Sequence, residues 1–317
     1  MDSRSTESPP SGGAVNQRTP YTYVLITPAR NEAGYIEGTV KSVISQTVRP
    51  AKWVIVSDGS TDGTDEIVQR YAAKHEWIEL LRMPERQERH FAGKVRAFNA
   101  GYDRVIGLHY DIIGSIDADI SFEPELFELL LKKFAEDPQL GLSGAPFAEA
   151  NFSYDFRFSS VDHVSGACQL FRRACFEDIG GYKPIKGGGI DVIAVLAARM
   201  KGWKTRTFTE KTYEHHRKIG TAKNGDLRAR FKDGEKDYVL GTHPVWEVFR
   251  SLYQTNKRPL IAGGCALLAG YLWATIRRAE RAVSPELMRF RRGDQMDRLK
   301  RFITSRGRCR NEKLKQG

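Results

Sequence analysis

Cysteine is scarce in this chain of 317 residues, which contains only 4. No two of them form a C-x-x-C pair, so the sequence predicts reduced thiols in a cytosolic setting, with neither a disulfide framework nor a zinc site. An internal repeat and the apolar segment of a secretory signal are also missing. Residues 1–20 are rich in Ser, Pro, Gly and Thr and hold no apolar stretch, which predicts a disordered tail.

Long hydrophobic runs are equally rare. The longest uncharged stretch of note, Pro259–Ile276, has 18 residues and lies near the lower limit of the about 17–25 residues that a membrane-spanning helix needs. An apolar stripe at helical spacing precedes it, formed by Val245, Trp246, Phe249, Leu252 and Tyr253. Together they predict a monotopic membrane-binding module. The alternative is a buried helix or a dimer contact in a soluble protein.

The net charge of +11 is placed unevenly. Residues 277–317 hold 14 Lys and Arg against 5 Asp and Glu, so this segment carries +9 and the rest of the chain +2. A basic tail suits partners that carry phosphate, either anionic lipid head groups or nucleic acid. Nucleic acid is not expected, because the tail lacks aromatic side chains interleaved with the basic ones. An anionic membrane surface is the predicted partner, and a solvated helix end without a specific partner is the alternative.

The first half of the chain alternates short apolar runs with helical patterns, which predicts βαβ units and a mainly parallel sheet. Strands are expected at Tyr23–Thr27, Trp53–Ser57, Ile78–Arg82 and Ile112–Ile116. Helices are expected at Ile36–Ser45, Asp65–Lys74, Lys94–Val105, Pro124–Phe134 and Val192–Met200.

The most informative motif is Asp117-Ala118-Asp119, directly after the apolar run Ile112–Ile116. It places two carboxylates at the carboxyl edge of the sheet, where open α/β sheets bind ligands. Two hard oxygen donors suit Mg²⁺ or Mn²⁺, which in turn hold phosphates. The alternative is that both acids cap the helix beginning near Pro124 or lie in a turn.

Three upstream segments add to this motif. The loop Pro28–Glu32 leaves the first strand, and the loop Ser57–Thr64 leaves the second with a carboxylate and two glycines that permit close backbone approach. The segment Gly93–Gly101 offers a helix N-terminus and the side chain of Lys94, and both suit anions. Each signal is weak alone, but their order along the chain indicates a nucleotide site.

With these motifs in this order, the chain resembles family 2 glycosyltransferases over roughly Tyr21 to Thr221. The matched patterns are P-x-x-N-E at Pro28, Asn31 and Glu32, D-G-S-x-D-G-T at Asp58 to Thr64, G-K-x-x-A-x-N-x-G from Gly93, D-x-D at Asp117 and Asp119, and G-G-Y at Gly180 to Tyr182. The resemblance implies the α/β GT-A fold, with a mainly parallel central sheet flanked by helices. The expected organisation is a GT-A domain over residues 21–221 and a helical, basic, membrane-associating extension over residues 222–317.

The resemblance also implies an activity: the inverting transfer of a sugar from a nucleotide-sugar donor to a hydroxyl acceptor, in polysaccharide or glycolipid biosynthesis, with Mn²⁺ or Mg²⁺. The acceptor would be a sugar or a lipid-linked sugar. Because nucleotide sugars are cytosolic, the expected location is the cytoplasm, peripheral or monotopic at the membrane. The implied nucleotide-binding residues are Pro28, Ala29, Asn31, Glu32, Asp58, Lys94 and Asp117.

The implied metal ligands are Asp119 and Asp117, joined by a histidine that follows the last strand of the catalytic unit. His215 and His216 both fit, His215 is favoured, and Arg217 next to them would meet a phosphate. A structural pair of histidines is the alternative.

Asp191 is the predicted general base, which an inverting transfer needs to deprotonate the attacking hydroxyl. The family usually has an E-D pair here, but Ile190 stands in place of the glutamate. The simpler alternative makes Asp191 a helix N-cap ahead of Val192–Met200. Because of Ile190, a catalytically impaired nucleotide-sugar or lipid-binding module is the second functional hypothesis. A sugar-nucleotide nucleotidyltransferase is the third, disfavoured because no glycine-rich phosphate loop follows the first strand.

Overall fold

The computed structural model describes residues 21–85, 92–148, 160–185, 187–217, 227–255 and 260–314, so the predicted N-terminal tail lies outside the described residues. The strands are β1 (Tyr23–Ala29), β2 (Lys52–Asp58), β3 (Ile78–Met83), β4 (Ile112–Ile116), β5 (Ile120–Phe122), β6 (Leu140–Gly144), β7 (Phe147–Ala148), β8 (Cys168–Arg172), β9 (Lys204–Thr207) and β10 (Tyr213–His215). The helices are α1 (Ile36–Ile44), α2 (Thr64–Ala72), α3 (Ala92–Val105), α4 (Leu126–Glu136), α5 (Arg173–Asp178), α6 (Ile190–Met200), α7 (Leu227–Val239), α8 (Pro244–Gln254), α9 (Ala262–Ile276) and α10 (Pro285–Leu314).

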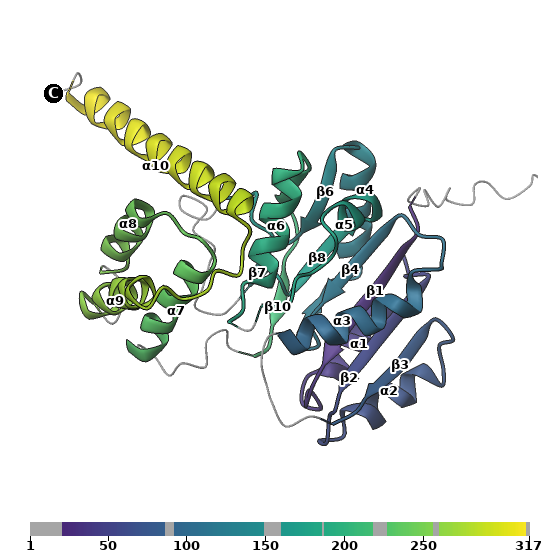
Figure 1. The fold of residues 1–317 in the computed structure, drawn as a ribbon. Coiled ribbons are helices and arrows are strands. Elements are labelled where there is room, and N and C mark those ends of the chain that lie inside the picture. Colours follow the sequence, from purple (N-terminus) through teal and green to yellow (C-terminus); the bar gives the residue numbers. More distant parts are fainter. Residues whose placement is uncertain are drawn as a thin grey trace, which may run out of the picture.

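A seven-stranded sheet in the order β3-β2-β1-β4-β8-β6-β9 forms the centre of the molecule (Figure 1). The first four strands are parallel, while β8 runs antiparallel to both β4 and β6. A small second sheet has the order β5-β10-β7. The expected α/β fold with a mostly parallel sheet is confirmed.

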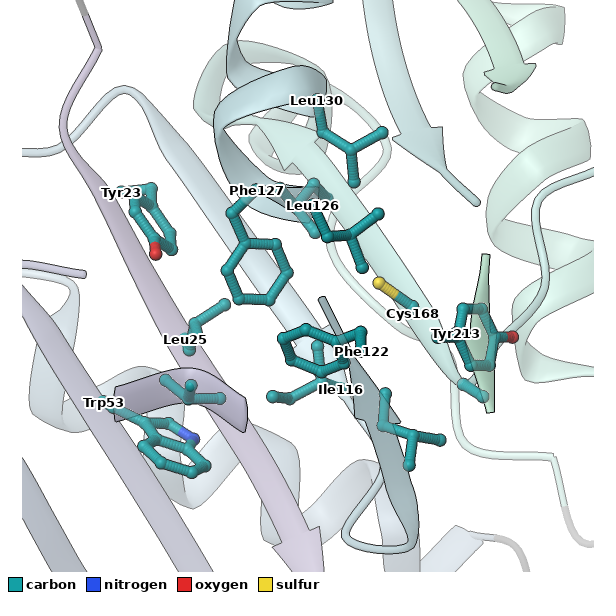
Figure 2. Close-up of a cluster of buried hydrophobic side chains, with 14 of the residues drawn as sticks. Tyr23, Leu25, Trp53, Ile116, Phe122, Leu126, Phe127, Leu130, Cys168 and Tyr213 are labelled. Atoms are coloured by element: carbon teal, nitrogen blue, oxygen red, sulfur yellow. The ribbon is translucent and has the colours of Figure 1, made fainter. Parts of the chain in front are cut away.

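Alternation along β1 divides the core into two layers, because successive side chains of a strand point to opposite faces. Tyr23 and Leu25 pack with helices α1, α2 and α4, whereas Val24 and Ile26 pack with α3, α5 and α6. Figure 2 shows part of the first layer, in which aromatic and aliphatic side chains of strands and of α4 meet. Trp53 is fully buried there, and its indole N–H donates to the Thr27 hydroxyl at 2.9 Å, so its polar atom is satisfied.

Helix α3 lies unusually close to the sheet because of Gly101. A Cβ on this residue would lie 2.7 Å from Cγ2 of Ile26. The last glycine of the G-K-x-x-A-x-N-x-G pattern therefore serves packing, and it lets the second half of α3 lie close to β1 and β2.

The C-terminal part is helical, with α7, α8 and α9 grouped beside the sheet and the long α10 projecting away from it (Figure 1). Helices α7 and α9 pack backbone to backbone: a Cβ on Gly270 would lie 1.9 Å from the carbonyl oxygen of Phe231, and one on Gly234 would lie 1.9 Å from that of Leu267. Helix α10 is tied to α6 by the ion pair of Arg199 with Asp294, whose N···O distance is 2.7 Å.

The uncharged stretch at Pro259–Ile276 forms α9 from Ala262 onward, and Pro259 itself lies outside the described residues. Across the described parts of the chain, no helix combines the length and the apolar character that a membrane crossing requires. Two of its glycines permit close helix contacts, Gly270 with Phe231 of α7 and Gly264 with Ser251 of α8.

Candidate active site

The two carboxylates of the D-x-D motif meet a histidine at the edge of the central sheet. Strand β4 ends at Ile116, the chain turns, and β5 pairs antiparallel with β10 so that Ile120 lies opposite His215. As a result, one ligand atom each of Asp117, Asp119 and His215 lies within 4.8 Å of the others. Among the described residues, this group has the composition and spacing of a divalent-metal site.

Hydrogen bonding orients the His215 ring toward this centre. Its Nδ1 lies 2.5 Å from the carbonyl oxygen of Arg217, which can only accept, so Nδ1 carries the proton and donates. The lone pair is therefore on Nε2, which lies 3.6 Å from Oδ1 of Asp119. A backbone partner that fixes the ring in this way is typical of metal-binding histidines.

The electrostatics also fit a cation. Asp119 is only 7% exposed, and its pKa is raised by burial and by the charge of Asp117, against the opposing effect of His215 and Arg217. A divalent ion between the two carboxylates would offset this repulsion and favour the ionised form.

Lys94 reaches the same centre from the start of α3. Its ammonium donates to Oδ1 of Asp117. Burial alone would lower the pKa of Lys94, but the carboxylates of Asp117, Asp191 and Asp119 outweigh this effect and raise it. The lysine is therefore charged at neutral pH and lies where a phosphate would approach the metal.

Arg217 is a second cation at this site. Its guanidinium donates to Oε2 of Glu32, and its Nε lies 3.6 Å from Oδ2 of Asp119. The guanidinium also lies over the ring of Tyr35, 5.6 Å from the centroid. Arg217 thus joins the first loop to the D-x-D motif, a link that the sequence did not reveal because Glu32 and Arg217 are far apart along the chain.

The predicted nucleotide-binding residues of the first two strands lie together. Pro28 and Ala29 pair in register with Val56 and Ser57, so the loops after β1 and β2 leave the same sheet edge. Asp58 ends β2 and is 5% exposed. The parallel register therefore puts these predicted contacts side by side.

Asn31 serves as a brace between these loops. It adopts a left-handed backbone with φ of 55°. Its N–H donates to Oγ of Ser60 at 3.1 Å, and its side-chain oxygen accepts from the N–H of Thr61 at 2.9 Å. Its side-chain oxygen thus supports the loop, and its contact with the nucleotide stays a prediction.

Glu32 is held by the same pair of loops. Its N–H donates to Oγ1 of Thr64 at 2.8 Å, and the Thr64 hydroxyl donates to Oδ1 of Asp62 at 2.5 Å. The D-G-S-x-D-G-T pattern thus has a structural reason: Asp62 and Thr64 fix the loop, while Asp58 ends β2 at its base.

Asp191 lies in the first turn of α6, which begins at Ile190. The N-cap is Gly189, with φ of 86°, so the interpretation of Asp191 as N-cap is wrong. A Cβ on Gly166 would lie 2.8 Å from Cβ of Asp191 and 3.1 Å from its Oδ2, so a glycine is needed there to seat this side chain. Ile190, which replaces the expected glutamate, packs against two apolar clusters.

Asp191 is linked to the metal centre through Lys94. It lines a small cavity of about 30 Å³ together with Lys94 and Ser115, and Lys94 in turn donates to Asp117. Its charge also acts on His163, whose pKa is lowered by burial against the opposing effect of Asp191. The structure thus brings Asp191, Lys94 and the D-x-D motif together, although they come from three separate elements.

A strand-edge D-x-D pair with a histidine, on a mostly parallel sheet, is the arrangement of GT-A glycosyltransferases. The chain superimposes with a TM-score of 0.56 and 20% identity on the mannosyltransferase PcManGT from Pyrobaculum calidifontis, solved in complex with GDP-Man and Mn²⁺, over 90% of this chain and 82% of that one. It superimposes with a TM-score of 0.54 and 15% identity on S. aureus TarS 1-349 in complex with UDP-GlcNAc, over 89% and 80%. At these identities the likeness shows the GT-A fold.

Residues 24–163 match the family model described as glycosyl transferase family 2. Over 123 residues the chain is 33% identical to hyaluronan synthase from Pasteurella multocida, covering 39% of this chain and 12% of that protein. Over 170 residues it is 24% identical to poly-beta-1,6-N-acetyl-D-glucosamine synthase from Staphylococcus aureus strain MSSA476, covering 47% and 39%. The chain thus spans about an eighth of the first relative's length and two fifths of the second's.

Proposed function

We propose that this protein is a metal-dependent, inverting glycosyltransferase that moves a sugar from a nucleotide-sugar donor to a hydroxyl of a polysaccharide or glycolipid acceptor. The observation that carries the proposal is the convergence of Asp117, Asp119 and His215 at the sheet edge, with Lys94 and Asp191 beside them. The relatives that make hyaluronan and poly-N-acetylglucosamine support the class of product.

Each group has a role in this reaction. Asp191 accepts the proton of the acceptor hydroxyl as its oxygen bonds to the anomeric carbon from the side opposite the diphosphate. The bond to the nucleoside diphosphate breaks, and its electron pair leaves with the phosphate oxygen. Lys94 and Arg217 stabilise the charge that develops there. A divalent cation held by Asp117, Asp119 and His215 would supply Lewis-acid stabilisation of the same charge.

Mn²⁺ is the proposed metal. The site combines two carboxylates with an imidazole, whereas Mg²⁺ prefers oxygen ligands alone and keeps several waters. The presence of Mn²⁺ in the PcManGT structure is consistent with this choice.

The test is metal-dependent nucleotide binding followed by turnover. UDP, GDP, CDP and dTDP are compared by thermal shift with and without Mn²⁺ or Mg²⁺. A ligand at a hundredfold excess over its Kd stabilises the folded state by about 2.7 kcal/mol. We expect a shift with one nucleotide in the presence of Mn²⁺, lost in Asp119→Ala and kept in Asp103→Ala, which removes an exposed carboxylate of α3.

The outcomes separate the hypotheses. Binding followed by release of the nucleoside diphosphate from the matching nucleotide sugar supports a transferase. Binding without any turnover favours the impaired binding module that Ile190 suggested. Absence of binding by every nucleotide, with or without metal, contradicts the proposal.

We further propose that the protein is peripheral on anionic membrane surfaces, at the cytoplasmic face. Helix α8 buries polar side chains and exposes apolar ones. Glu247 and Ser251 are buried, while Val245, Val248 and Leu252 are 50%, 46% and 63% exposed. We call these three exposed residues the α8 stripe. Trp246, Phe249 and Tyr253 of the predicted stripe are instead half-buried.

The surroundings of the α8 stripe match an anionic bilayer rather than a neutral surface. Leu260 and Ile261, 60% and 69% exposed, precede α9, and Ile276 at the other end of that helix is 75% exposed. The segment 277–317 adds the basic charge described above. A peripheral protein binds acidic lipid through two contributions: burial of exposed apolar side chains in the bilayer and attraction of basic groups to the anionic head groups.

Vesicle sedimentation tests this surface. We expect binding to vesicles that contain phosphatidylserine, weaker binding to phosphatidylcholine alone, and loss of binding in the double variant Val248→Asp/Leu252→Asp. Ile106→Asp, which changes a residue 47% exposed after α3, serves as the matched control. Equal binding by the double variant and the wild type would contradict the membrane role, as would no binding by the wild type.

A further inference from the structure

A second pocket lies between the start of α6 and the C-terminal helices α7, α8 and α10. Its volume is about 360 Å³. It is lined by Gly189, Asp191, Val192, Lys236, Asp237, Leu240, Thr242, Trp246, Arg250, Arg291 and Gln295. Asp191 also lines the small cavity beside Lys94, so this carboxylate borders both cavities.

Three cations line the pocket, Lys236, Arg250 and Arg291, with the carboxylates of Asp191 and Asp237. Lys236 already pairs with Asp233 at 3.0 Å, outside the lining. Asp237 is shared, because its Oδ2 pairs with Arg250 and its Oδ1 lies 3.8 Å from Nη2 of Arg291. One carboxylate therefore serves two guanidinium groups, an imbalance that Glu247 and Asp294 offset only in part at Arg291, whose pKa is still lowered.

Burial makes this imbalance costly. It lowers the pKa of Arg250, and it lowers that of Arg291 to about 10, because both guanidinium groups have lost water without gaining full compensation. Nη1 of Arg291 donates to the carbonyl oxygen of Leu240 at 2.9 Å, a neutral acceptor. A bound anion would supply the compensation that the protein itself does not.

Two neighbouring groups also point to an anion. Thr242 is 1% exposed and lines the pocket, and its hydroxyl finds no hydrogen-bond partner among the described residues, although buried hydroxyls are normally paired. The first turn of α6 lies in the pocket wall at Gly189, Asp191 and Val192, where a helix presents N–H groups and positive potential.

We propose that this pocket binds an acidic group, a phosphate or a carboxylate, on the sugar acceptor and thereby holds the acceptor hydroxyl at Asp191. The inference rests on the proposed transferase and names the class of its acceptor. Arg250, Arg291 and Lys236 bind the acidic group, and the Thr242 hydroxyl donates to it. Trp246 supplies an apolar wall for the rest of the acceptor.

Calorimetry with small probes tests the pocket without divalent metal, so that the metal-dependent donor site takes no part. The anionic probes are octyl phosphate, inorganic phosphate and glucuronate, and the neutral probes are octyl glucoside and glucose. We expect anionic probes to bind and neutral ones to bind at least tenfold more weakly. Arg250→Gln weakens anion binding at least tenfold, and Arg250→Lys less.

Two further variants keep the test decisive. Lys236→Gln changes a side chain that is 37% exposed, so it tests the pocket even where Arg250→Gln reduces folding. Arg277→Gln, at a side chain 50% exposed and outside the pocket lining, is the matched control and leaves anion binding unchanged. Preference for octyl phosphate identifies a phosphate-bearing acceptor, and preference for glucuronate identifies an acidic sugar.

The proposal is overturned by equal binding of glucose and glucuronate together with equal binding of the two octyl probes. It is also overturned by anion binding that persists in both Arg250→Gln and Lys236→Gln. Failure of the transferase itself is distinguishable, because it appears as absent Mn²⁺-dependent nucleotide binding while binding of acidic probes in the pocket stays intact.

Discussion

The substitution Gly166→Ala tests the role of Asp191 without altering its chemistry. The added Cβ would lie 2.8 Å from Cβ of Asp191. Because an ordinary carbon–carbon contact is about 3.5–4.0 Å, the aspartate must withdraw by roughly 1 Å. Gly166 does not have a left-handed backbone, so alanine itself is tolerated there.

A displacement of this size should lower turnover strongly, because a misplacement of about 1 Å in a reacting group can cost on the order of 100-fold. Removing the base by Asp191→Asn should cost on the order of 100- to 10,000-fold. Neither change touches the metal ligands, so Mn²⁺-dependent nucleotide binding should stay close to that of the wild type.

The assay is steady-state release of the nucleoside diphosphate in the presence of acceptor, together with nucleotide binding and thermal unfolding of each variant. Gly38→Ala, whose added Cβ meets nothing within 4 Å, is the matched control and should keep full turnover. Full turnover in a folded Gly166→Ala or Asp191→Asn protein would refute the assignment of Asp191 as general base.

Three further predictions concern stability. Gly270→Ala forces a Cβ to 1.9 Å from a backbone oxygen of α7. Its free energy of unfolding should fall by about 1–3 kcal/mol, measured by thermal unfolding. An unchanged Tm would contradict the close helix contact. Glu247 is buried, which raises its pKa to about 8; since its unfolded pKa is lower, folding favours the protonated form and stability falls as pH rises through the interval up to about 8. Glu247→Gln should therefore stabilise the protein at pH 9 and have little effect at pH 4, as measured by chemical denaturation, and an equal effect at both pH values would contradict this. The pKa of Asp62 is lowered: partial burial opposes the shift, but hydrogen bonds from Thr64 and the N–H of Ala33 outweigh it. Ionised Asp62 stabilises the folded state above its unfolded pKa, and this stabilisation is lost as pH falls through its lower folded pKa. Asp62→Asn should therefore weaken the fall of unfolding free energy at acidic pH. An unchanged acid dependence would contradict the role of Asp62 in fixing the loop.

Much of the catalytic half could be predicted from local sequence. The short apolar runs predicted the first four strands, and the helical patterns between them predicted parallel crossovers. The pairing of the loops after β1 and β2 followed from a parallel sheet, in which the carboxyl ends of neighbouring strands share an edge.

The sequence predicted least where a residue's position depends on a contact with a segment distant along the chain. The cap of α6 is Gly189 rather than Asp191, because a left-handed glycine starts the helix two residues earlier. The stripe expected on α8 is divided: Val245 and Leu252 are exposed, Trp246, Phe249 and Tyr253 are half-buried, and the buried residues of this helix are the polar Glu247 and Ser251. Hydrophobic spacing alone does not distinguish the face that packs from the face that is left exposed.

The sequence by itself determined the strand–loop–helix order and the residue types at the strand ends, since these depend on neighbours along the chain. Only the tertiary structure decided that His215 and Arg217 lie beside Asp119, and that Arg250 and Arg291 share Asp237 in a pocket at Asp191. These contacts join segments far apart in sequence, and they form because strand pairing and helix packing bury both partners together. Such burial is a property of the whole fold, and no local pattern records it.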